Sequence, residues 1–340
     1  MSASRYLHLI EFPIALGIQN QALGLRCSIA LGNVNGSLYL PRPNLPAVGS
    51  DLSFRRLNPP AVRNIAFAAR MHDHSEQPAE NFSWGGYSSW NPKDLANSAV
   101  AFVEFAALAF PAKQKGRWAT FDDITSQFGQ HFDACCSRLV DWIEVQTHAD
   151  LDSTQPFERV SVGPKWSTAA WTYRDAGKNE HEYPNYTINV MGASLQERAL
   201  DKRQWSNAVR GANRSLRPPE IHLLLRDARA AQLRSSGRRA VLDAATAVDL
   251  IVGPALRSML LKRNAPAFVE RLLKQEWQFK RRMELMHSLG MFVPPGLSVD
   301  VMELRNKVIH GNKPVSHAQA HKAVEIAQAL AEHYTPLGVP

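Results

Sequence analysis

The chain has 340 residues, 45% of them hydrophobic, which excludes global disorder and is enough for two packed domains. No run approaches the roughly 18 consecutive apolar residues of a membrane-spanning helix, and the N-terminal residues lack the apolar core of a signal peptide. The three cysteines are too few for a disulfide framework, so we expect a soluble cytoplasmic protein that does not bind membranes.

The basic charge is concentrated in the last third of the chain. From Arg217 to the C-terminus there are 18 Lys and Arg against 11 Asp and Glu, a net charge of +7. Residues 1–216 hold the other 21 basic and 20 acidic residues, a net charge of +1. This asymmetry favours an acidic partner for the last third, with nucleic acid first, although solvated helix faces produce the same excess.

Residues 1–195 are expected to form an α+β domain with a mainly antiparallel sheet. A turn at Asn33–Gly36 is typical of a hairpin connection, and the polar stretch His74–Asp94 is expected to be a long surface loop. Apolar residues at helical spacing predict a long helix over Thr120–Thr147 that packs across the sheet. The runs that predict strands are Tyr6–Phe12, Leu23–Leu31, Ser37–Leu40, Asn64–Ala69, Ala99–Phe110, Trp166–Tyr173 and Tyr186–Met191.

The sequence changes character at Arg217-Pro218-Pro219. A helix is expected at Leu195–Asn213, so residues 196–217 would be a bridging helix and linker. Residues 218–337 then show one helical pattern after another with short links, which is typical of an all-α bundle. The expected helices are Pro219–Ser235, Arg238–Arg263 with a kink at Pro254, Phe268–Leu273, Lys280–Leu289, a helix capped by Ser298–Asp300, and a last helix from Ser316.

The helix before Gly311 carries an arginine, an asparagine and a histidine: Arg305, Asn306 and His310. Arg305 and His310 are five residues apart, which places them about 140° apart around an ideal helix, so they do not share one face. The two side chains can converge if the long arginine reaches round or if His310 lies where the helix is already ending at Gly311. A second copy of the helix across a two-fold axis would also complete one cleft. In the last turn, His310 faces the negative end of the helix dipole, which favours its protonated form. The simpler alternative is a surface arginine and a histidine that caps the helix.

The segment Pro218–Tyr334 resembles the HEPN superfamily of helical-bundle domains. The motif Arg305-Asn306-Lys307-Val308-Ile309-His310, followed by Gly311, matches the Arg-polar-x3-His motif of that superfamily. Residues 218–228 and 239–249 resemble the first two helices of such domains in bacterial proteins. In those bacterial domains an acidic residue, more often Glu, occupies the position of Asp249.

For members that keep both motif residues, this resemblance implies a metal-independent endoribonuclease that needs no cofactor. The 2′-hydroxyl of RNA attacks the adjacent phosphate and leaves a 2′,3′-cyclic phosphate, with the histidine moving protons and the arginine stabilising charge. The candidate catalytic residues are Arg305, His310 and Asn306, the candidate substrate-binding residues are Lys307, Asn312 and Lys313, and Asp249 is a candidate supporting acid.

The resemblance also implies partners. We expect RNA, a homodimer formed through the bundle, and an antitoxin or regulatory protein, in a defence or toxin setting with residues 1–195 as a sensor or targeting domain. The alternative function is a non-catalytic dimeric module that binds RNA, a nucleotide or a protein.

Other clusters carry weaker patterns. His72-Asp73-His74 resembles part of a metal site, but no third ligand is placed by spacing. Cys135 and Cys136 are expected to be core residues rather than nucleophiles, and the pair His131 and Cys135 falls short of a zinc site. The aromatic residues around Gly85-Gly86 are more typical of loop anchoring than of base stacking.

Overall fold

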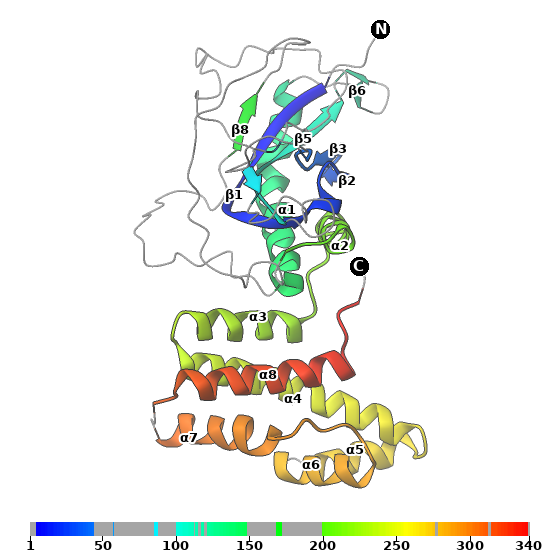
Figure 1. Cartoon of the computed structure of the whole chain (residues 1–340). Helices are drawn as coiled ribbons and strands as arrows, with labels where there is room; N and C mark the ends of the chain where they lie inside the picture. Colours follow the sequence, from blue (N-terminus) through cyan, green and yellow to red (C-terminus); the bar gives the residue numbers. More distant parts are fainter. Residues whose placement is uncertain are drawn as a thin grey trace. The chain divides into compact units, whose positions relative to one another are not determined.

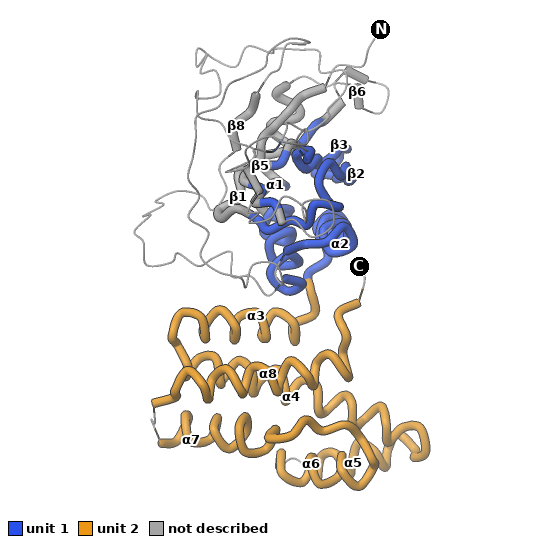
Figure 2. The backbone as a smooth tube through the Cα atoms, viewed as in Figure 1, with its two compact units in different colours: residues 1–147, 154–217, 340 blue, residues 148–153, 218–339 orange. Residues whose placement is uncertain are grey.

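The computed structural model describes residues 5–43, 57, 85–87, 100–111, 113–114, 117–118, 121–147, 168–171, 199–275, 278–311 and 314–338. The chain divides into two compact units (Figure 2). Unit 1 comprises residues 1–147, 154–217 and 340, and unit 2 comprises residues 148–153 and 218–339. The main division falls between Arg217 and Pro218, beside the two prolines at which the sequence changes character.

Unit 1 contains an antiparallel sheet, which confirms the expected α+β character (Figure 1). Its strands run in the order β2-β3-β5-β1-β8, and β4 also pairs with β5. A separate two-stranded sheet joins β6 and β7. The strands are β1 (Arg5–Gln19), β2 (Arg26–Leu31), β3 (Val34–Tyr39), β4 (Gly85–Tyr87), β5 (Val100–Pro111), β6 (Lys113–Gln114), β7 (Arg117–Trp118) and β8 (Thr168–Trp171).

The expected hairpin connection is present, but its turn lies earlier than expected, and the expectation for the loop His74–Asp94 is wrong in part. The hairpin between β2 and β3 turns at Gly32-Asn33, because Gly32 adopts a φ of 58° and Leu31 already pairs with Val34. Part of the expected loop His74–Asp94 is a strand instead, since β4 pairs with the edge that β5 offers it. The expected strands Asn64–Ala69 and Tyr186–Met191 lie outside the described residues.

The long helix is confirmed as α1 (Phe121–Thr147), with Leu139, Trp142 and Ile143 among its buried residues. Helix α2 (Lys202–Asn213) packs against it within unit 1. The expected start of α2 at Leu195 is wrong, because Leu200 instead exchanges backbone hydrogen bonds of 2.9 Å with Gly17 and Gln19 of β1. The helix begins only after Asp201.

The cap and packing of α2 account for this position. Asp201 Oδ1 accepts a hydrogen bond of 2.7 Å from the backbone N–H of Gln204, and the Gln204 side chain accepts one of 2.9 Å in return, which forms a capping box. At the other end, Gly211 lies directly on the indole of Trp142, where a Cβ would overlap the ring. The Trp142 Nε1–H donates a hydrogen bond of 2.9 Å to the Leu216 carbonyl, so the two helices are joined closely.

Unit 2 is all-α in its described residues, 218–275, 278–311 and 314–338, as expected (Figure 1). Helix α4 packs against α3 and α8 and contributes more of the core than any other helix of this unit, including Val241, Val248, Ile251 and Leu256. By length and composition alone, an 18-residue window of α4 would suit a membrane span, and its apolar side lies in this core. The helices are α3 (Glu220–Leu233), α4 (Gly237–Leu261), α5 (Pro266–Gln275), α6 (Phe279–Ser288), the π-helical segment η4 (Leu297–Glu303), α7 (Leu304–Gly311) and α8 (His317–Tyr334).

Candidate functional site

The Arg-Asn-x3-His motif lies on α7, directly after η4. Val308, fully buried in the bundle core, anchors the helix from its middle. Around this anchor Arg305 is half-buried, while Asn306, Lys307 and His310 are exposed. The polar residues of the motif therefore lie at the surface of the bundle, and one apolar residue holds them there.

The start of this helical segment differs from the expected cap at Ser298–Asp300. Gly296 precedes η4 with a φ of +83°, and the backbone N–H of Asp300 donates a hydrogen bond of 2.7 Å to the Gly296 carbonyl. A Cβ at Gly296 would overlap Asp300 Oδ2. Because only glycine combines this φ with so close an approach, Gly296 determines where the segment begins. The Asp300 carboxylate also forms an ion pair of 2.9 Å with Lys322 Nζ, which connects η4 to α8.

Asp249 of α4 interacts electrostatically with two arginines, Arg305 of α7 and Arg282 of α6. Burial raises the pKa of Asp249 above its usual range, while the positive charges of Arg305 and Arg282 act in the opposite direction. Arg305 Nη1 also donates a hydrogen bond of 3.1 Å to Asn306 Oδ1. Asp249, the candidate supporting acid, therefore interacts with Arg305 through its charge.

Arg282 is the residue that sequence reasoning missed. It lies on α6, and its Nη1 would be 4.0 Å from a Cβ placed on Gly253 of α4, one helical turn after Asp249. The basic run Lys280-Arg281-Arg282 was a visible signal, but nothing in that run distinguishes the arginine that faces α4 from its neighbours. Asp249, Arg282 and Arg305 are called the charged triad below.

His310 lies apart from this triad. Both Arg305 and His310 belong to the α-helical segment α7, so the expected offset of about 140° applies within one chain. Among the described residues, His310 forms no hydrogen bond and is exposed in the last turn. The candidate substrate-binding residue Lys307 is exposed on the same helix, whereas Asn312 and Lys313 lie outside the described residues. The structure thus joins Arg305 to Asn306 by a hydrogen bond, gives Arg305 an electrostatic influence on Asp249, and leaves His310 exposed to solvent.

The weaker candidates are placed as follows. Cys135 and Cys136 are buried in α1, as expected for core residues, and burial raises the pKa of the Cys135 thiol to about 11. Such a thiol is protonated at neutral pH and is a poor nucleophile. His131, on the same helix, is exposed. His72-Asp73-His74 lies outside the described residues, and the rest of the chain that is described contains no group of three or more potential metal ligands.

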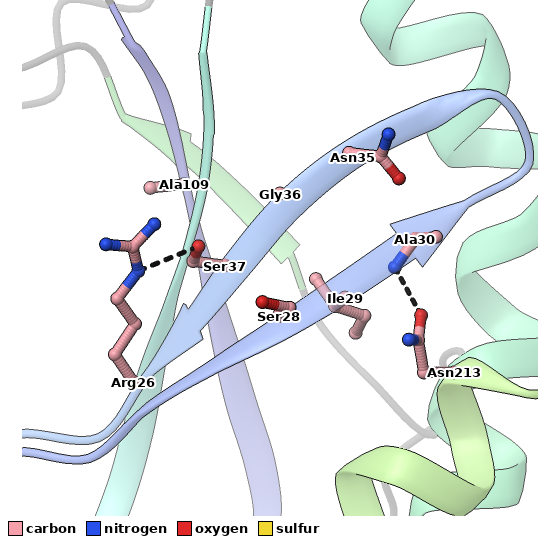
Figure 3. Close-up of a pocket in the computed structure, with 9 residues that line it drawn as sticks. All are labelled: Arg26, Ser28, Ile29, Ala30, Asn35, Gly36, Ser37, Ala109 and Asn213. Carbon is pink, nitrogen blue, oxygen red and sulfur yellow. Dashed lines mark hydrogen bonds between the residues drawn. The ribbon is translucent and has the colours of Figure 1, made fainter.

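Unit 1 has a polar hollow of about 340 Å³ on the β2–β3 hairpin (Figure 3). Within it the Arg26 Nε–H donates a hydrogen bond of 3.0 Å to Ser37 Oγ, and Asn213 Oδ1 accepts one from the backbone N–H of Ala30. The Arg26 guanidinium also lies 5.6 Å from the centre of the Tyr39 ring. These residues already have partners, so the hollow shows how the end of α2 joins the hairpin rather than a reactive arrangement.

Comparisons of the chain with models of known protein families, with curated proteins and with solved structures gave no match.

Proposed function

We propose that unit 2 is a HEPN-like helical bundle and that the chain is a metal-independent endoribonuclease. The observation that carries this proposal is the setting of the motif. Arg305 donates a hydrogen bond to Asn306 and interacts electrostatically with Asp249, while His310 is exposed and without a hydrogen bond among the described residues. An oriented cation and an accessible proton carrier are what cleavage by the 2′-hydroxyl requires. The net charge of +7 from Arg217 onward supports RNA as the substrate.

The proposed reaction balances with these groups alone. His310 accepts the proton of the 2′-hydroxyl as its oxygen attacks the adjacent phosphorus. Arg305 stabilises the negative charge on the pentacoordinate phosphate, and the bond from phosphorus to the 5′-oxygen breaks. The leaving 5′-oxygen takes up a proton from a protonated His310, so the products are a 2′,3′-cyclic phosphate and a 5′-hydroxyl. DNA lacks the attacking hydroxyl and is not cleaved.

A homodimer suits this chemistry. Because Arg305 and His310 are offset by about 140° on one helix, a single copy does not direct both at one phosphate. A two-fold arrangement of two α7 helices would place arginines and histidines from both copies around one cleft. One histidine could then act as base and the other as acid.

Residues 1–195 are proposed to act as a sensor or targeting domain in a cytoplasmic defence or toxin protein, controlled by an antitoxin or regulatory protein.

The alternative is a non-catalytic dimeric module that binds RNA, a nucleotide or a protein. The observation that favours it is the separation of His310 from Arg305, since within one chain the two motif residues do not meet. Both functions use the same surface of α7, so only a chemical assay separates them.

The test is cleavage of single-stranded RNA by the purified protein in the presence of EDTA. We expect products that end in a 2′,3′-cyclic phosphate and a 5′-hydroxyl, and no cleavage of DNA of the same sequence. His310→Ala is the matched inactive control. If wild type and His310→Ala bind RNA equally and neither cleaves it in EDTA or in magnesium, the binding module replaces the nuclease.

A further inference from the structure

We propose that the end of α4 and helix α5 form a surface that binds single-stranded RNA, on which Phe268 stacks with a base and the basic side chains around it contact phosphates. This proposal rests on the proposed function in taking RNA as the ligand. It places an RNA contact outside the Arg-Asn-x3-His motif, on helices that carry no motif residue.

The first support is the distribution of charge within the basic third of the chain. Residues 257–275 contain five Lys and Arg against one Asp or Glu, a net charge of +4. The rest of the chain from Arg217 onward holds 13 Lys and Arg against 10 Asp and Glu, a net charge of +3. One short segment therefore carries more than half of the basic excess. Such a concentration is typical of a surface that binds a polyanion.

The second support is the way in which α5 presents this segment. The helix contacts the end of α4, and its fully buried residue Val269 lies on the inner side (Figure 1). Phe268, Arg271 and Lys274 follow one another at intervals of three residues, so they are neighbours on the helix surface. All three are exposed. The outer side of α5 thus combines an aromatic ring with two cations.

The third support is that most of these charges lack an acidic partner. Glu270, the one acidic residue of the segment, forms an ion pair of 2.6 Å with Arg257 Nε, so its charge is already matched. Within the described part of the chain, the exposed residues Lys262, Arg263 and Lys274 form no ion pair. Exposed cations of this kind are free to neutralise phosphates, with release of the counterions of the RNA.

The fourth support is the aromatic ring, which favours RNA over an acidic protein. Phe268 is 44% exposed, although it is a large apolar residue. The Arg271 guanidinium carbon lies 6.0 Å from the centre of its ring. A stacked base and its flanking phosphate need a ring and a cation side by side, and this combination binds single strands with little regard to sequence. An acidic protein would be attracted by the charge alone.

The first experiment measures binding of a fluorescein-labelled single-stranded RNA of mixed sequence to the full chain, in the His310→Ala background so that the RNA stays intact. Phe268→Leu keeps an apolar side chain but removes the aromatic face. Phe292→Leu is the matched control, because Phe292 is 40% exposed in the same unit but lies outside residues 257–275. We expect Phe268→Leu to bind RNA at least about fivefold more weakly, as for the loss of one stacked base, and Phe292→Leu to bind as its parent does.

The salt dependence of binding tests the phosphate contact. Arg271→Gln is compared with Arg203→Gln, which removes the same charge from an exposed position on α2 in unit 1. Arg271→Gln should lower the slope of log Kd against log salt by about 0.7, the value for one phosphate of a single strand. Arg203→Gln should leave the slope unchanged. Arg271→Lys keeps the charge and should keep the slope.

Glu270→Gln separates RNA binding from a purely structural role. This variant removes the acidic residue of the segment and releases Arg257 from its ion pair. RNA binding should become several-fold tighter and the salt slope steeper by about 0.7, even though α5 loses a contact with α4. A purely structural role predicts weaker or unchanged binding, and that result would overturn the surface.

The outcomes separate this inference from the proposed function. Equal affinities of Phe268→Leu and Phe292→Leu, with equal salt slopes of Arg271→Gln and Arg203→Gln, overturn the surface even if the wild type cleaves RNA. The expected differences without any cleavage by the wild type keep the surface and refute the nuclease. If polyglutamate of equal charge competes as well as RNA and Phe268→Leu weakens neither, the surface binds an acidic polypeptide, and RNA is refuted as its ligand. Failure of the protein to bind this RNA at all refutes both.

Discussion

Replacing Gly296 with alanine should destabilise the segment that carries the motif. An alanine at the observed φ of +83° costs roughly 1–2 kcal/mol in backbone conformation. Its Cβ would overlap Asp300 Oδ2 and lie 3.2 Å from Ile326 Cδ1, and relieving this overlap adds about 1–3 kcal/mol. The displaced carboxylate also loses its ion pair with Lys322, which is partly exposed and contributes at most about 1 kcal/mol. We expect a total loss of roughly 2–6 kcal/mol.

Gly290→Ala is the matched control. Gly290 also has a positive φ, +66°, but nothing lies within 4 Å of an added Cβ. This variant should therefore lose only the conformational part, about 1–2 kcal/mol. Urea unfolding followed by circular dichroism measures both losses, and hydrogen exchange locates them. Gly296→Ala should speed exchange over residues 297–311 more than Gly290→Ala does, and equal effects of the two variants would refute the reasoning.

The remaining predictions concern the site and the packing of unit 1. His310→Ala should abolish RNA cleavage and change the unfolding free energy by less than about 0.5 kcal/mol, because the side chain is exposed. Arg305→Lys should lower the cleavage rate about 10²–10³-fold, as much as Arg305→Ala does, because lysine lacks the forked donors. Burial raises the pKa of Asp249, so the folded state binds the carboxyl proton more tightly than the unfolded state does. The unfolding free energy of the wild type, measured in urea, should therefore fall as the pH rises from about 3.8 through the pKa of the folded state. Asp249→Asn should not show this fall. Gly211→Ala should lower the free energy of unfolding, measured in urea, by about 1–3 kcal/mol, because the added Cβ would overlap the Trp142 indole.

Much of the local structure could be predicted because it depends on patterns within one segment. The spacing of apolar residues located α1 and α4, and the long apolar run located β5, because each element buries one face or both faces. The prolines at 218 and 219 lie where the two units divide. The Arg-Asn-x3-His motif is also local, and its helix was expected where α7 lies.

The tertiary structure decided which distant residues meet. The strand β4 forms because β5 provides a pairing partner. Its three residues, two of them glycine, show no strand pattern by themselves. The start of η4 depends on the close approach of Gly296 to Asp300, and no pattern in the sequence predicts that approach. The two arginines of the run Lys280-Arg281-Arg282 look alike in the sequence, and only the packing of α6 shows that Arg282 is the one that approaches α4. Helical spacing specifies which residues share a face, but only the packing of one helix on another specifies what that face meets.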